Sequence, residues 1–112
     1  MSHEPPKILD PLREPIVETI HHDVAGLYFR SVFLKEGGSV IPQHVHDYDH
    51  ATYVATGSVR LWVDGSWKGD YGAGEAIRIA AGHSHLFCSL QPNTRLCCVH
   101  HTDSALSAMR KE

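Results

Sequence analysis

The sequence of 112 residues has few cysteines, no surplus of positive charge and no long apolar run. Its three cysteines contain no CxxC pair and so do not indicate a disulfide framework. With 10 Lys and Arg against 13 Asp and Glu, the formal net charge is -3, which leaves no basic field to hold a phosphate backbone. No segment approaches the roughly 20 apolar residues that span a bilayer, and the first residues lack the features of a secretory signal. We therefore expect a cytoplasmic protein without a nucleic-acid or membrane partner.

Proline is concentrated at the start of the chain. Four of the six prolines lie in the first 15 residues, where no sustained periodicity is present. Because proline fixes φ and lacks a backbone N–H, residues 1–15 are predicted to form an extended N-terminal arm. The remaining length suits one compact unit, so residues 16–112 are predicted to form a single domain.

After this arm, short runs rich in β-branched and aromatic residues are separated by glycine, which predicts an all-β sandwich or barrel. The dipeptide Asp64-Gly65 between two such runs predicts a two-residue hairpin. Residues 69–74 are expected to form a turn, and residues 102–110 carry the capping and helix-forming side chains of a short C-terminal helix. The expected strands are 16–20, 27–35, 40–45, 51–56, 58–63, 66–68, 76–79, 85–90 and 96–101.

Histidine is the residue in excess, with 10 in the chain and three of them within residues 44–50. Side chains alternate along a strand, so His44 and His46 are expected to share one face. A turn after His46 would bring His50, at the start of the next strand, toward the same point. Three imidazoles in this arrangement could bind one metal ion.

This segment resembles the first sequence motif of the cupin family. In that motif a glycine is followed after five residues by His-x-His, then by a glutamate and finally by a second glycine. Gly38, His44, His46 and Gly57 match it, and His50 stands where the family has its glutamate.

A second cupin motif follows at the expected place in the chain. Gly74, Gly82 and His85 match its spacing, whereas Ala80 replaces a proline of the family pattern and Ser89 replaces its asparagine. Together the two motifs extend from residue 38 to residue 89.

The resemblance implies a double-stranded β-helix, or jelly-roll, barrel that holds one divalent transition metal ion. His44, His46, His50 and His85 would be the ligands. An all-nitrogen ligand set suits Fe, Ni, Cu or Zn better than Mg or Ca, and Mn is a further candidate for the bound ion. The resemblance also suggests a homodimer.

Further residues are candidates for the wall of a ligand pocket. Alternation from His50 and from His85 places four side chains on the interior face, although filling the core is the ordinary role of such residues. Positions in turns and at strand ends near the histidines supply three more candidates. Their alternative role is to stabilise a turn or to lie exposed to solvent. The pocket candidates are Tyr48, Thr52, Val54, His83, Phe87, Ser89 and His100.

Replacing a carboxylate ligand by the neutral imidazole of His50 leaves more positive charge on the ion, which favours an anionic ligand. The leading hypothesis is a metal-dependent enzyme that acts on a small, oxygen-rich organic molecule. With Fe, Ni or Cu the reaction would be dioxygenase-like, and with Zn or Mn it would be that of an isomerase, lyase or cyclase. The alternative is a non-catalytic cupin that binds or senses a small ligand.

Overall fold

The computed structural model describes residues 4–5, 17–45 and 48–101 of the chain. Its secondary structure consists of strands, and no helix in this part of the chain is long and apolar enough to cross a membrane. The predicted C-terminal helix and almost all of the predicted arm lie outside the described residues. In chain order the strands are β1 (Val17–Val24), β2 (Leu27–Leu34), β3 (Val40–Val45), β4 (His50–Thr56), β5 (Ser58–Val63), β6 (Ser66–Gly72), β7 (Ala76–Ile79), β8 (Ser84–Ser89) and β9 (Thr94–His101).

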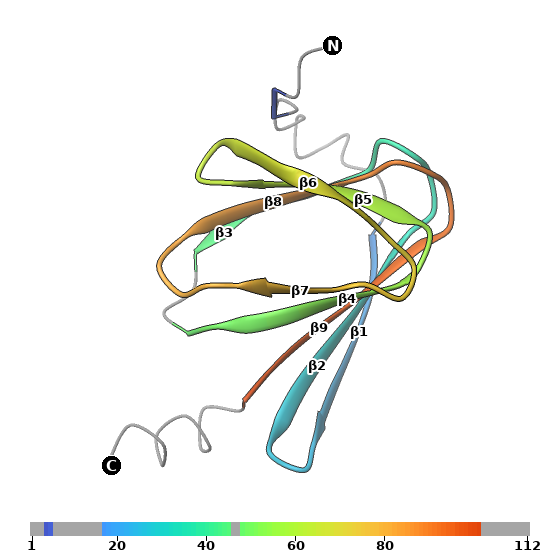
Figure 1. Ribbon diagram of the computed structural model, residues 1–112. Helices are drawn as coiled ribbons and strands as arrows, with labels where there is room; N and C mark the ends of the chain where they lie inside the picture. The colour runs from blue at the N-terminus through green and yellow to red at the C-terminus, as the bar shows by residue number, and fades with distance from the viewer. Residues whose placement is uncertain (1–3, 6–16, 46–47, 102–112) are drawn as a thin grey trace.

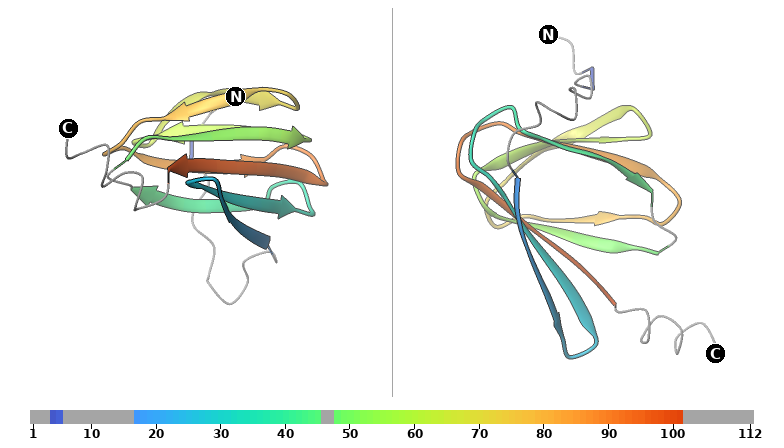
Figure 2. Two further views of the ribbon diagram at one scale, coloured as in Figure 1. Left: turned by 90° about the horizontal axis from the view of Figure 1, so that it is seen from below. Right: turned by 180° about the vertical axis from the view of Figure 1, so that it is seen from behind.

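The strands form two antiparallel sheets that lie face to face (Figure 1). The five-stranded sheet has the order β1-β2-β9-β4-β7, and the four-stranded sheet has the order β3-β8-β5-β6. Strands distant in sequence are neighbours, as in the pairing of β2 with β9 and of β3 with β8. Figure 2 shows the two layers from other sides. This is the all-β jelly-roll barrel that the sequence predicted.

The core lies between the sheets because inward residues alternate with outward ones. In β4, Thr52 and Val54 are fully buried, whereas Ala51 and Tyr53 are exposed. The buried apolar side chains pack into one cluster, and the removal of this apolar surface from water drives folding. The cluster comprises Val32, Leu34, Ile41, Val54, Val59, Leu61, Ile77, Ile79, Phe87 and Leu96.

The largest differences from the predicted strand boundaries are at the ends of β6 and β1. The turn expected at residues 69–74 is largely strand, because β6 continues to Gly72 and pairs with β5 along this length. Gly69 lies where the register shifts between Leu61 and Trp62, so it belongs to a bulge and does not end the strand. Strand β1 likewise continues to Val24 through polar residues. Both are edge strands whose backbone pairing does not require an alternating apolar pattern.

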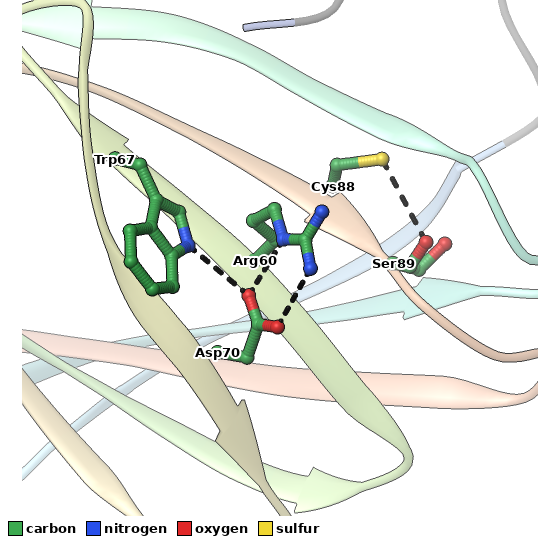
Figure 3. Close-up of polar contacts among 5 residues, drawn as sticks. All are labelled: Arg60, Trp67, Asp70, Cys88 and Ser89. Carbon is green, nitrogen blue, oxygen red and sulfur yellow. Dashed lines mark hydrogen bonds and ion pairs between the residues drawn. The ribbon is translucent and has the colours of Figure 1, made fainter. Parts of the chain in front are cut away.

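The β5–β6 hairpin forms as predicted. Asp64 and Gly65 have φ values of 51° and 80°, as a two-residue turn with two left-handed positions requires. On the outer surface, the Arg60 guanidinium donates hydrogen bonds of 2.7 and 2.8 Å to the Asp70 carboxylate (Figure 3). The Trp67 indole N–H donates to the same carboxylate at 3.3 Å. These contacts join the two strands on the face that points away from the core.

Candidate metal centre

Two of the four predicted ligands meet between the sheets. His50 begins β4 in one sheet, and His85 lies in β8 of the other. The side chains are 7% and 5% exposed, and their ring centroids are 5.0 Å apart with an interplanar angle of 55°. The Nδ1 atoms of both rings are buried. The structure therefore places these two imidazoles in contact inside the barrel.

The other two predicted ligands belong to β3 and the residues after it. His44 is the Cα partner of His85 in the β3–β8 ladder, and the register shifts between Ile41 and His44. The backbone thus brings β3 next to the histidine pair through a bulge, where the prediction assumed a regular strand. His46 lies outside the described residues. Among the described side chains, no group of three or more His, Cys, Asp or Glu is arranged to hold a metal, so the four-histidine centre stays a prediction.

An aromatic group lies beside His50. The β4–β9 register pairs Ala51 with Val99, so His100 occupies the position next to His50 across the ladder. The His100 ring is 4.4 Å from the Tyr48 ring and 5.0 Å from the Tyr28 ring, measured between centroids.

Hydrogen bonds define the tautomer of His100. Its Nδ1 lies 2.6 Å from the carbonyl oxygen of His101, which can only accept, so Nδ1 carries the hydrogen. In the neutral ring, Nε2 then accepts from the Tyr48 hydroxyl, 3.3 Å away. Tyr48 and His100, both predicted as pocket residues, are thus brought together by this hydrogen bond. Tyr28, which contacts His100 from β2, was missed because nothing in its local sequence indicates that β2 pairs with β9.

Three of the interior pocket candidates, Val54, Phe87 and Ser89, make contacts that the structure defines. Val54 lies in the hydrophobic core, and Phe87 is packed with its edge toward His85 at a centroid distance of 5.9 Å. The Ser89 hydroxyl donates to the Glu36 carbonyl at 2.8 Å and accepts from the Ser39 N–H at 3.0 Å. Ser89 therefore ties the β2–β3 connection to the end of β8 that is distant from His85. Of the three, Phe87 has a ring contact with the histidine pair, at His85.

The fourth interior candidate, Thr52, faces a cysteine. Its hydroxyl lies 3.5 Å from the Cys98 sulfur. Burial raises the pKa of the Cys98 thiol, and the contact with Thr52 partly opposes this shift. All three cysteines are free and half-buried.

A cleft of about 400 Å³ is lined by residues of β5, β6 and β7, and β6 and β7 are edge strands of the two different sheets. We call it the β6–β7 cleft. Two of its wall residues are cross-strand partners of the candidate ligands, since Val63 pairs with His85 and Ile79 pairs with His50. The cleft therefore adjoins the histidine pair. Its lining is Leu61, Val63, Asp64, Lys68, Tyr71, Ile77, Arg78, Ile79, Ala80 and His83.

Of the predicted pocket residues, His83 is the one that lines this cleft. Sequence reasoning missed Lys68, Tyr71 and the isoleucines of β7. The only local signal was the alternation of exposed and buried positions in β7, which indicated an inward face without indicating a cleft. The placement of the two sheet edges that leaves this opening is not encoded in any one segment.

Two carboxylates, Asp64 in the lining of the cleft and Asp49 bound to the lining residue Arg78, accept hydrogen bonds on both of their oxygens. Asp49 accepts hydrogen bonds from Arg78 at 2.6 and 3.2 Å and from the Ala81 N–H at 2.8 Å. Asp64 contacts His83 Nδ1 at 2.5 Å and accepts from Ser84 N–H at 2.9 Å. Hydrogen bonds from Arg78 and from His83 lower the pKa of Asp49 and of Asp64, respectively. Both carboxylates therefore remain ionised at neutral pH.

Two antiparallel sheets with buried histidines between them and a lateral cleft define a jelly-roll barrel with a candidate internal ligand site. The family described as "Cupin domain" matches residues 31–99, which is more than half of the chain. The chain belongs to the cupin family. No curated protein matches the sequence.

Solved structures agree with this fold. KdgF from a Halomonas species superposes with a TM-score of 0.69 at 18% identity, covering 84% of this chain and 88% of its own. A cupin superfamily protein from Desulfitobacterium hafniense gives 0.67 at 13% identity, covering 91% and 97%. Oxalate decarboxylase from Bacillus subtilis, which has Mn(II) centres, gives 0.62 at 22% identity over 70% of this chain and 22% of its own. At these identities the likeness concerns the fold.

Proposed function

We propose that this cupin is a metal-dependent enzyme that acts on a small, oxygen-rich organic molecule. The ion would be held by His44, His46, His50 and His85. The observation that carries the proposal is the burial of His50 and His85 with their rings 5.0 Å apart. Two imidazoles brought together away from solvent, from different sheets, suit a shared transition metal ion. The backbone position of His44 opposite His85 supports a third ligand from β3.

When bound, the ion would act as a Lewis acid toward an oxygen of the substrate. The chain's own residues would shape the surroundings. His50, a neutral ligand in place of the family carboxylate, adds no negative charge and so favours an anionic substrate. Phe87 excludes water on one side of His85. The hydrogen bond between Tyr48 and His100 holds the Tyr48 hydroxyl near the start of β4.

Metal analysis tests the proposal directly. We expect untagged protein, purified without a nickel column, to contain about one transition metal ion per chain by elemental mass spectrometry. His85→Ala should lose the ion because a buried ligand is removed. His22→Ala, at an exposed position of β1, is the matched control and should retain it.

Two results would contradict the proposal. One is full metal occupancy in His85→Ala, and the other is a metal-free wild type that gains no ion from added Fe, Ni, Cu, Zn or Mn. His50→Glu restores the family carboxylate and should keep the ion while weakening the binding of anionic ligands. The metal found decides which reactions to screen, with oxygen consumption first for Fe, Ni or Cu and isomerisation or elimination first for Zn or Mn.

A further inference from the structure

We infer that the β6–β7 cleft binds the body of an elongated organic carboxylate, with its anionic end at Lys68. This inference deepens the proposed function, on which the role of the bound molecule as substrate rests. The cleft offers an apolar wall, the Tyr71 hydroxyl and the Lys68 ammonium group, whereas its other cation, Arg78, is paired with Asp49. A volume of about 400 Å³ suits a small molecule of this kind.

The polar groups of the cleft select an acceptor. The ammonium group of Lys68 forms no hydrogen bond or ion pair within the described part of the chain, and the Tyr71 hydroxyl forms no hydrogen bond there. The carboxylates of Asp49 and Asp64 already accept from donors on both of their oxygens. Lys68 and Tyr71 therefore have donors to offer, and Asp64, the carboxylate in the lining, already accepts on both oxygens, which favours a carboxylate over a cationic ligand.

The apolar wall sets the shape of the ligand. Leu61, Val63, Ile77 and Ile79 form this wall, and it would cover an unbranched or ring-shaped hydrocarbon body. Cross-strand partners in an antiparallel sheet have Cβ atoms roughly 5 Å apart, so a ligand against Val63 and Ile79 lies beside the histidines. A molecule with its carboxylate at Lys68 would thus direct its other end toward the candidate metal centre.

Hexanoate is a suitable probe, with hexan-1-ol as its uncharged counterpart. We expect hexanoate to shift the amide NMR signals of Val63 and Ile77 in chelator-treated protein, in a saturable manner. Lys68→Gln should weaken hexanoate binding about two- to fivefold, the range for an exposed ion pair, and should leave hexan-1-ol binding unchanged. Lys68→Arg should restore hexanoate binding. Lys35→Gln, at an exposed lysine that does not line the cleft, should have no effect.

The inference is overturned if hexanoate leaves these signals unchanged, or if Lys68→Gln binds hexanoate as tightly as the wild type. It is also overturned if hexan-1-ol binds as well as hexanoate. Because the titration uses metal-free protein, it does not depend on the four-histidine centre. Metal absent from untreated protein with Lys68-dependent binding intact would refute the proposed function alone, whereas metal present without such binding would refute this inference alone.

Discussion

Gly57 separates β4 from β5, and its replacement by alanine should destabilise the barrel strongly. Its φ of 76° is in the left-handed region, and an added Cβ would lie 2.1 Å from Thr94 Oγ1 and 2.7 Å from Thr94 Cα. Thr94 is fully buried and its hydroxyl donates to the Gln91 carbonyl at 2.9 Å, so it has little freedom to move away. The steric conflict therefore falls on the backbone of β9.

The matched control is Gly26, in the β1–β2 turn. Its φ is 74°, but an added Cβ would meet nothing within 4 Å. A left-handed alanine costs about 1–2 kcal/mol, partly offset by about 0.4–1 kcal/mol from the restricted unfolded chain. Gly26→Ala should therefore lower the free energy of unfolding by about 1 kcal/mol. Gly57→Ala carries the same cost plus about 1–3 kcal/mol for overpacking.

Thermal unfolding followed by circular dichroism measures the difference between the two variants. For a domain of this size about 1 kcal/mol corresponds to about 4–8 °C in Tm, so Gly57→Ala should melt roughly 10 °C below Gly26→Ala. Equal Tm values would refute the reasoning, because they would mean that φ alone determines the cost and that the approach to Thr94 is easily relaxed. Urea unfolding should rank the two variants in the same order.

Three further predictions concern the core and the rim of the cleft. Phe87→Ala should lower the free energy of unfolding by about 3–5 kcal/mol, measured in urea, whereas Phe87→Leu should cost less than half as much; similar losses would contradict the packing seen. Asp64→Asn should lower Tm above pH 3.8, because the hydrogen bond from His83 lowers the pKa of Asp64 in the folded protein. The difference in Tm from the wild type should vanish as the pH falls through that lowered pKa. A difference that stays constant with pH would refute the stabilising role of the ionised Asp64. Thr52→Val should slow alkylation of Cys98 by raising its pKa further, with Cys88 alkylation as the internal control; an unchanged rate would show that the 3.5 Å contact is not a hydrogen bond.

Much of the fold could be predicted because its strands are amphipathic or bounded by turn residues. The bounds of β3, β5 and β7 agree with the predicted ranges, and the hairpin at Asp64-Gly65 is correct. The end of β6 was missed because Gly69 and Gly72 suggest a turn when the neighbouring strand is not known. Pairing with β5 decides this end, and such pairing is a property of the sheet and not of the local sequence.

Part of the candidate site could likewise be predicted from the sequence, and part could not. Motif spacing was sufficient to predict that His50 and His85 come together, because the resemblance carries the topology with it. The cleft could not be predicted, since Lys68, Tyr71 and Ile77 belong to strands of two different sheets. Each of these residues has an ordinary local explanation as a surface or core position. Only the closure of the barrel shows that they surround one space.

The separation between His50 and His85 depends on the distance between the two sheets, because each ring comes from a different one. Side chains that fill the space between the layers set this distance, and Phe87 is the one in edge contact with His85. Gly57, by contrast, acts through Thr94 at the far end of β4 from His50. Substitutions at Phe87 should therefore weaken metal binding and stability together. Gly57→Ala should lower stability while the folded fraction keeps its metal affinity, and parallel losses in both variants would mean that the histidine pair responds to global stability alone.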